Sequence, residues 1–247
     1  MKQNHLIQPL KILAALLVVA LLALPASPAL ANDTGLHMPI FGSTVSHSPG
    51  DRLWNGSVYL RFTGVSYSYA ILENVGTVSH YLRATSYQLG IPSGSTIHGI
   101  EVVVKRNAPG GGVRDHRVRL IRGLDTVFPT DRADTLTDWP PGPDNFQSKT
   151  YGGPNDLWGR TWTAEELNAD NFGVVLSAVR TAPSSSETDS RASVDTIQVR
   201  AYYTLPATTT TVACGNGTLV YGSGLTCVAT VTGSAGSNTP TGTVGWA

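Results

Sequence analysis

Four aromatic side chains in the middle of the chain are the first residues whose types suit ligand binding. They are Trp139, Tyr151, Trp158 and Trp162. Flat aromatic faces bind the apolar CH surfaces of sugar rings, so the four could form a platform for a glycan. The alternative is burial, because a Trp side chain commonly buries about 150–250 Å² in a core or as a loop anchor. Burial is the favoured interpretation, and Trp139, which lies in a Pro-rich loop, is expected to be the most exposed.

A second group of side chains offers oxygen atoms to a metal ion. It comprises the aspartates in the loops between expected strands: Asp131, Asp134, Asp138, Asp144 and Asp156. Calcium takes six to eight oxygen ligands, often from loops of this kind. The spacing lacks the twelve-residue EF-hand pattern with its Gly and terminal Glu. A solvated loop is therefore the favoured interpretation, calcium is the alternative, and the sequence indicates no other cofactor.

Catalytic residues do not form a recognisable signature. The nucleophile elbow Gly-x-Ser-x-Gly does not occur. Glu165 and Glu166 are consecutive on an expected helix, so they point apart and are a poor pair to face one glycosidic bond. His98 and His116 each stand alone, without a His-x-x-x-His metal pair. We therefore predict that the protein is not an enzyme, and a glycan hydrolase using the acids of residues 131–156 is the least favoured alternative.

Residues 1–31 have the pattern of a secretory signal peptide. Lys2 and Lys11 precede the apolar run Ile12–Leu24, and an Ala-Leu-Ala cleavage pattern follows. A membrane anchor is the alternative, but a span needs about 20 apolar residues and this run is shorter. We expect cleavage before Asn32 and a secreted protein with no membrane contact afterwards.

The remaining sequence divides into two regions of different composition. The formal net charge of the chain is zero, so there is no basic footprint for nucleic acid. Residues 206–247 contain no Lys, Arg, Asp or Glu, whereas residues 32–205 contain all the acids. Pro206 cannot donate to a strand ladder and is a natural end for the preceding strand. We therefore predict two domains, 32–205 and 206–247.

Alternating apolar and polar residues predict that residues 32–205 form antiparallel strands. Ile100, Val102 and Val104 alternate with Glu101 and Lys105, and residues 196–203 also alternate with period two. Residues 172–179 are apolar on both faces, and residues 57–62 and 81–89 are further candidates. Gly- and Pro-rich turns separate these runs. Asp195 has the phase of the inward-facing residues of its strand. We expect it to cap a loop by accepting backbone amides rather than to act in catalysis.

One short helix interrupts the strands. Thr163-Ala-Glu-Glu166 is a capping box, in which the hydroxyl and the carboxylate each accept a backbone amide. The helix can continue only to about residue 169, before the strand that follows. Many short strands with one helical turn predict an all-β fold, a jelly-roll-like β-sandwich.

Two regions resemble known modules. Thr208–Thr211, Val220–Gly222, Leu225–Thr232 and Pro240–Val244, in this order, resemble the opening half of a bacterial immunoglobulin-like repeat. Such a repeat typically has about 80 to 100 residues. The resemblance implies a partial immunoglobulin-like β domain, truncated within the repeat. The chain is then expected to be a fragment, with further repeats and a wall-anchoring signal beyond Ala247.

The larger region more loosely resembles a jelly-roll-like domain found in secreted bacterial proteins. The segments that carry this likeness are Ile91–Ile100, Tyr151–Gly153, Leu157–Gly159, Asn171–Val174, Val194–Asp195 and Tyr202–Tyr203. This resemblance implies architecture and context, and no activity.

Cys214 and Cys227 flank Gly-rich turn residues, which predicts that the chain returns between them on neighbouring antiparallel strands. Disulfides persist outside the cytoplasm, so we predict that the two are bonded. Closing so short a loop stabilises by about 3 kcal/mol on the chain-entropy model. Separate thiols, or partners in a missing half-domain, are the alternatives.

Together these patterns predict a secreted or cell-surface, non-enzymatic structural or adhesion module. The sandwich would present binding loops, and the immunoglobulin-like region would act as a spacer. A carbohydrate-binding module, with or without calcium, is the alternative. The expected partners are extracellular glycans or surface proteins, and nucleic acid is not among them.

Overall fold

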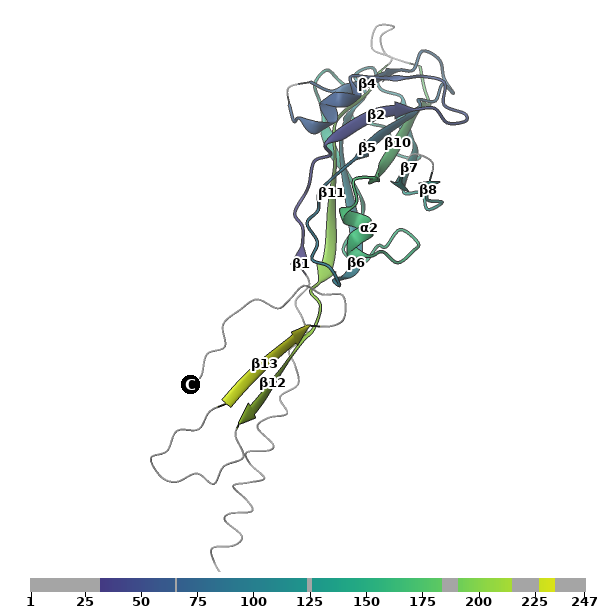
Figure 1. Cartoon of the computed structure of the whole chain (residues 1–247). Helices are drawn as coiled ribbons and strands as arrows, with labels where there is room; N and C mark the ends of the chain where they lie inside the picture. The colour runs from purple at the N-terminus through teal and green to yellow at the C-terminus, as the bar shows by residue number, and fades with distance from the viewer. Residues whose placement is uncertain (1–31, 65, 124–125, 184–190, 215–226, 234–247) are drawn as a thin grey trace, which may run out of the picture. The chain divides into compact units, whose positions relative to one another are not determined.

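The computed structural model describes residues 32–64, 66–123, 126–183, 191–214 and 227–233. These residues form an all-β sandwich and a separate two-stranded hairpin (Figure 1). The six-stranded sheet has the order β3-β4-β11-β6-β9, with β1 paired to β11. The five-stranded sheet has the order β2-β5-β10-β7-β8. Ladder partners run antiparallel throughout both sheets, so the predicted all-β sandwich is confirmed.

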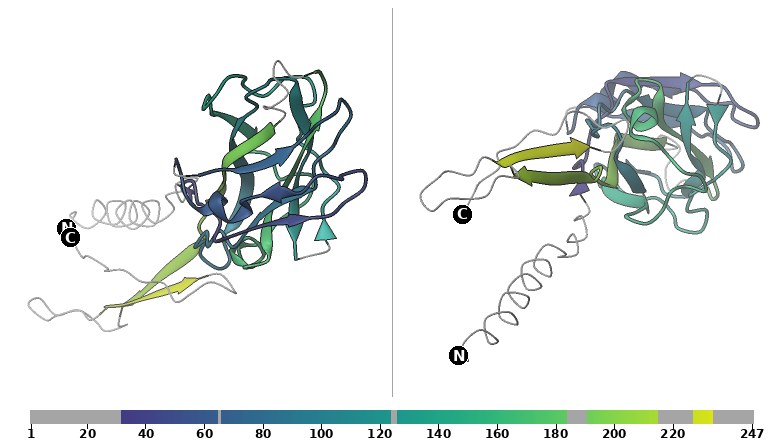
Figure 2. Two further views of the ribbon diagram at one scale, coloured as in Figure 1. Left: turned by 90° about the horizontal axis from the view of Figure 1, so that it is seen from above. Right: turned by 60° about the horizontal axis from the view of Figure 1, so that its bottom comes forward.

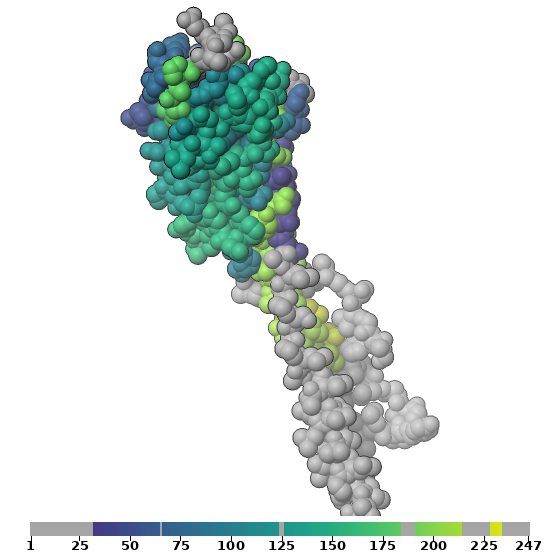
Figure 3. Space-filling model, turned by 180° about the vertical axis from the view of Figure 1, so that it is seen from behind, coloured from purple at the N-terminus to yellow at the C-terminus, as the bar shows by residue number. Residues whose placement is uncertain are grey.

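The strands of the two sheets have the following bounds. The six-stranded sheet contains β1 (Asn32–Asp33), β3 (Trp54–Asn55), β4 (Ser68–Ile71), β6 (Thr96–Asn107), β9 (Gln147–Gly152) and β11 (Arg191–Thr204). The five-stranded sheet contains β2 (Phe41–Val45), β5 (Tyr81–Thr85), β7 (Val113–Arg122), β8 (Thr126–Val127) and β10 (Phe172–Arg180). Figure 2 shows the two sheets from two further directions. In Figure 3 the middle of the chain, coloured teal to green, forms most of the face of the sandwich seen from behind.

The core lies between the sheets and is built by the alternation that the sequence shows. Ile100, Val102 and Val104 of β6 are fully buried. They belong to one apolar cluster with Leu120 of β7 and Leu176 of β10. Burying each such side chain stabilises the fold by about 1.5–3 kcal/mol relative to leaving it in water. The predicted central strand is β10, which pairs with β5 on one side and β7 on the other.

The predicted helix is α2 (Ala164–Asn168), and both halves of its capping box are formed. The Glu166 amide donates to Thr163 Oγ1, and the Thr163 amide donates to Glu166 Oε2, each over 3.2 Å. Leu167 on its inner side is buried. The helix ends at Asn168, one residue before the predicted limit.

The prediction of a strand at residues 57–62 is wrong. Those residues form the 3-10 helix η1 (Ser57–Arg61), preceded by Gly56 with φ 68°. This left-handed conformation favours glycine, and it turns the chain out of an extended path. A Cβ on Gly56 would lie 2.7 Å from the Tyr59 ring. The alternation of residues 57–62 predicts a strand, but the left-handed conformation of Gly56 turns the backbone into a 3-10 helix instead.

The hairpin consists of β12 (Thr208–Cys214) and β13 (Cys227–Gly233). Their register runs from Thr208 opposite Gly233 to Cys214 opposite Cys227. The expected signal peptide lies outside the described residues, as does most of the rest of the expected immunoglobulin-like region. Within the described part of the chain, no helix has the length and apolar character needed to cross a membrane.

Candidate functional site

The four aromatic side chains proposed as a sugar platform are all buried. Their exposed fractions are 0% for Trp139, 4% for Tyr151, 1% for Trp158 and 6% for Trp162. The expectation that Trp139 is exposed is wrong, because its indole N–H donates to the buried carboxylate of Asp115 over 2.8 Å. The three tryptophans therefore anchor loops to the core, and Tyr151 packs there from β9. Burial is the interpretation that the sequence favoured, and it leaves no open aromatic face.

Asp115 is the residue that organises this region, and sequence reasoning missed it. Its carboxylate pairs with Arg106 and accepts the Tyr151 hydroxyl over 2.7 Å. Burial, reinforced by the charge of Asp115, raises the pKa of Tyr151. Asp115 follows Arg114 and precedes His116 in β7, so its sequence neighbourhood resembles an exposed polar strand. The alternation with Val113 was the available signal that it faces inward.

The structure does not gather the five aspartates proposed for calcium. Four of them have separate basic partners: Asp131 with Arg117 and Arg119, Asp134 with Lys149, Asp138 with Arg114, and Asp156 with Arg132. The hydrogen bond from Lys149 lowers the pKa of Asp134, and the one from Arg132 lowers the pKa of Asp156. Among the described residues, no three His, Cys, Asp or Glu side chains lie close enough to hold a metal ion.

The fifth aspartate, Asp144, lines a cavity that also contains Asp195. This cavity, the Asp195 pocket, has a volume of about 360 Å³. Its lining residues are Gly64, Ser66, Tyr67, Lys105, Asp144, Phe146 and Asp195. They come from the loop before β4, from β6 and β11, and from the loop before β9. Four segments distant in sequence therefore meet at one concave site.

A β-bulge in β11 places Asp195 in this pocket. Val194 lies opposite Arg106 and Thr196 opposite Lys105, so Asp195 is the extra residue. The two residues of such a bulge oppose one residue of the neighbouring strand, which interrupts the alternation. Asp195 therefore lies beside Lys105 rather than in the apolar core with Ile197. The expected inward phase is corrected for this reason.

Both oxygens of Asp195 have partners. Oδ1 accepts the Gly64 amide over 3.0 Å, which confirms the expected role in capping a loop. Oδ2 lies 2.8 Å from Lys105 Nζ, in an ion pair whose Asp195 side chain is 5% exposed and whose Lys105 side chain is 39% exposed. A lysine ammonium has three donors. The exposed side of Lys105 therefore retains donor capacity toward the pocket.

Two aromatic rings stand at the same pocket. The ring centroids of Tyr67 and Phe146 lie 5.2 Å apart, and the rings are tilted by 49°. Both side chains are half-buried. Asp144 beside them is exposed and has φ 55°, a left-handed conformation in which Asp is several-fold enriched. The pocket thus combines aromatic surface, a cation and carboxylates.

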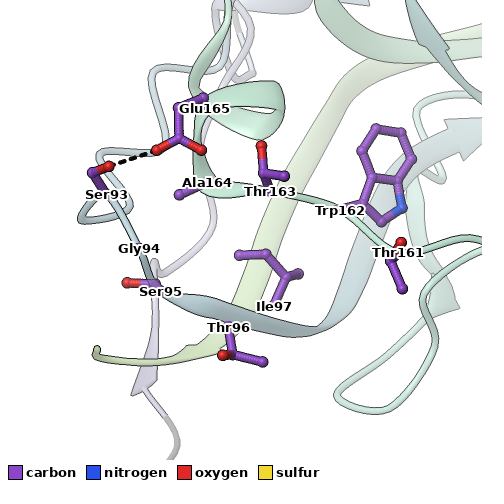
Figure 4. Close-up of a pocket in the computed structure, with 10 residues that line it drawn as sticks. All are labelled: Ser93, Gly94, Ser95, Thr96, Ile97, Thr161, Trp162, Thr163, Ala164 and Glu165. Carbon is purple, nitrogen blue, oxygen red and sulfur yellow. Dashed lines mark hydrogen bonds between the residues drawn. The ribbon is translucent and has the colours of Figure 1, made fainter. Parts of the chain in front are cut away.

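A second cavity, of about 440 Å³, lies between the start of β6 and α2 (Figure 4). Hydroxyl groups line it, and Ser93 donates to Glu165 Oε1 over 2.6 Å. This hydrogen bond lowers the pKa of Glu165. Trp162 contributes to the wall, but it is 6% exposed and leaves no ring face open. The cavity therefore lacks the aromatic surface of the Asp195 pocket.

The remaining residues singled out in sequence have structural partners. His98 Nε2 lies 3.1 Å from the Thr204 hydroxyl, and His116 Nδ1 lies 3.0 Å from the Ser177 hydroxyl. Glu166 completes the helix cap and pairs with Arg160 and Arg122. None of these contacts brings a histidine and an acid together in the manner of a catalytic pair.

Tyr67, Lys105 and Phe146 were not singled out from the sequence. The Tyr67-Ser-Tyr69 repeat and the Asp144-Asn-Phe146 turn are visible there. Nothing local connects these segments, since their shared position depends on the pairing of β4, β11, β6 and β9.

Comparison with known proteins gives a fold likeness only. No family model and no curated protein matches the chain. A solved structure described as "CBM4 structure and function", a carbohydrate-binding module, is similar over 65% of this chain and 85% of that chain. The sequence identity is 10% and the TM-score is 0.32. A likeness at this level supports no inference about a ligand.

Proposed function

We propose that the sandwich is a non-enzymatic module of a secreted or cell-surface protein and that it binds a carbohydrate in the Asp195 pocket. The observation that carries this proposal is the meeting of Tyr67 and Phe146 with the Asp195–Lys105 pair in one cavity. Ligand sites typically combine apolar and aromatic walls with a few well-placed polar groups. Adhesion through a glycan is then the cellular role, with the β12–β13 region as the start of a spacer.

The chemistry of a sugar fits these groups. One face of a pyranose ring is lined by CH groups, which pack on aromatic rings such as Phe146. Its hydroxyls donate to carboxylates and accept from ammonium groups, so Asp144 and Lys105 supply complementary partners. Oδ1 of Asp195 accepts the Gly64 amide, and Oδ2 has the Lys105 ammonium as its ion-pair partner without a hydrogen bond. This arrangement suits the fixed orientation of Lys105 and the loop at Gly64, rather than the transfer of a proton to a leaving group.

Glycan-array screening followed by calorimetry on the secreted chain tests the proposal. We expect binding to one class of glycans built from neutral sugars or from neutral and charged sugars together. Phe146→Ala or Tyr67→Ala should weaken this binding about tenfold. The matched control is Phe41→Ala, because Phe41 is 61% exposed and lies in the other sheet. Turnover of a bound glycan, or binding that survives both pocket variants, would count against the proposal.

A further inference from the structure

The outer face of the five-stranded sheet carries a row of arginines. On β5, β10 and β7, which lie side by side (Figure 1), Leu82, Leu176 and Leu120 face the core. The residues next to these leucines along each strand face away from the core. The register places Arg83 opposite Val175, and Val175 opposite Arg119. Two guanidinium side chains therefore flank one valine across three strands.

Arg117 extends this row along β7. It lies opposite Ser177 and two residues before Arg119, so both arginines project from the same face. Val175 is only 2% exposed, and the aliphatic stems of the neighbouring arginines are suited to cover it. The charged ends remain at the surface, with side-chain exposures of 40% for Arg117 and 25% for Arg119. We call Arg83, Arg117 and Arg119 the arginine face.

The arginine face has more positive charge than its acidic neighbours neutralise. Asp131 Oδ2 serves two of the three arginines, at 3.2 Å from Arg119 Nε and 3.4 Å from Arg117 Nε. Arg83 Nε donates to Ser43 Oγ over 2.9 Å. Within the described part of the chain, the ion pairs include none between Arg83 and a carboxylate. Because the whole chain is formally neutral, this excess is a local feature.

A stack of three rings adjoins the arginines. The His47 ring lies on Tyr81 with a centroid distance of 3.8 Å, and the His116 ring lies 5.8 Å from His47. Burial lowers the pKa of His47, and burial with the charge of Arg117 lowers the pKa of His116 to about 4. Both imidazoles are therefore neutral near pH 7. At that pH they add ring surface beside the arginines and no further charge.

We propose that the arginine face binds a linear anionic polysaccharide. Its carboxylate or sulfate groups would pair with Arg83, Arg117 and Arg119, and its sugar rings would pack against the neighbouring ring stack. Guanidinium groups match such oxyanions in a bidentate geometry. This site lies on the outer side of the five-stranded sheet, whereas the Asp195 pocket is built from β6, β11 and loops beside the six-stranded sheet. The two proposals are therefore independent.

The spacing of the arginines favours a polymer over a small anion. Neighbouring strands lie about 4.8 Å apart, so the backbones at Arg83 and Arg119 are separated by about 10 Å. Arg117 and Arg119 are separated by about 6.8 Å along β7. A single small anion brings its charge to one point of this row, whereas a chain with a charge on successive units can give each of the three arginines a separate partner.

Affinity electrophoresis of the secreted chain tests this proposal. The probes are polygalacturonate, which carries carboxylates, dextran sulfate, which carries sulfates, and uncharged dextran. We expect retardation by at least one anionic polymer, none by dextran, and weaker retardation as the NaCl concentration rises. The double variant R83Q/R119Q should bind about tenfold more weakly. A single-stranded oligothymidylate is the fourth probe.

Two controls make the result decisive. Arg200→Gln changes an arginine on the outer face of the six-stranded sheet and should leave retardation unchanged. Circular dichroism melts identify any variant that fails to fold, in which case the single variant R83Q replaces the double one. Unchanged retardation of folded R83Q/R119Q, equal loss in R200Q, or equal binding to oligothymidylate would each overturn the proposal.

Discussion

At the scale of single residues, Asp115 shows how a charge is accommodated between the sheets. Its side chain has no exposed surface, and that of Arg106 is 3% exposed. The Trp139 indole, the Tyr151 hydroxyl and the Asp134 amide all donate to the same carboxylate. Burying a charge is tolerated when it is paired and its lone pairs are satisfied. The network therefore explains why two aromatic side chains near Pro-rich turns lie inside.

Asp115→Asn should be strongly destabilising. The change leaves the Arg106 guanidinium buried without its counter-charge, which costs about 3–5 kcal/mol in comparable cases. Urea denaturation followed by tryptophan fluorescence measures the free energy of unfolding. Asp138→Asn is the control, because its ion pair with Arg114 is half exposed and is worth at most about 1 kcal/mol. Similar losses in the two variants would show that burial of the network contributes nothing specific.

His116 makes the stability of the sandwich depend on pH. Its pKa is lowered from 6.5 to about 4 by burial first, and then by Arg117 and by His47. Between these values the unfolded chain binds a proton that the folded chain does not. The free energy of unfolding therefore decreases as the pH falls from about 6.5 toward 4, because protons bind the His116 ring of the unfolded chain first. Asp131 and Arg119 also face this ring, and their effects are included in the lowered pKa.

Comparison of the wild type with His116→Gln isolates this effect. Glutamine takes up no proton, so the variant should gain stability relative to the wild type as the pH falls from 7.5 to 4.5. After allowance for solvent screening at this partly exposed ring, we expect a relative gain of about 1 kcal/mol. Urea denaturation at the two pH values measures the difference. A constant difference between the proteins would contradict a lowered pKa.

At the scale of elements, the success of sequence reasoning depended on whether the determining contacts are local. The alternation in β6, the doubly buried strand β10 and the capping box of α2 follow from neighbouring residues, and all three were predictable. The wrong strand at η1 and the wrong exposure of Trp139 arise from a left-handed glycine and from a partner 24 residues away. The Asp115 partner of Trp139 leaves no signal in the local period, whereas Gly56 is a local signal that the alternation of the following residues outweighed.

The bulge in β11 shows that long-range contacts also limited the prediction of the candidate site. Asp195 was singled out in sequence as a loop cap, and its bond to Gly64 spans 131 residues. Its direction was wrong because one extra residue in a strand reverses the phase of everything before it. The pocket itself requires β4, β11, β6 and β9 to be neighbours, an order that no segment specifies alone. Of the residues that line the pocket, only Asp144 and Asp195 were singled out by their type, and their shared location was not predictable.

At the scale of the whole molecule, the two proposed binding regions lie on different sheets. The Asp195 pocket combines rings with a bonded ion pair, whereas the arginine face carries unbalanced positive charge. A module with two such regions could contact two parts of one polysaccharide or two different ones. When both regions contact one polysaccharide, the first attachment raises the effective concentration for the second, which would suit the proposed role in adhesion.

The hairpin that follows the sandwich supplies a test of the export prediction. The register of β12 and β13 places Cys214 directly opposite Cys227. Directly opposite residues of antiparallel strands have Cα atoms about 4.5–5.5 Å apart, which lies within the range of about 4.4–6.8 Å for disulfides. We therefore expect a disulfide between Cys214 and Cys227 when the chain is exported to an oxidising compartment. Peptide mapping without reductant should yield one linked peptide pair containing both cysteines.

The double variant C214S/C227S measures what the bond contributes. Since it closes a short loop, its loss should destabilise the hairpin region by about 3 kcal/mol on the chain-entropy model. Protease cleavage between the two positions should become faster, while the melting of the sandwich stays unchanged because its core residues all precede Leu205. Alkylation of both thiols in the exported wild type, without prior reduction, would contradict the bond. It would also remove the chemical support for an oxidising destination.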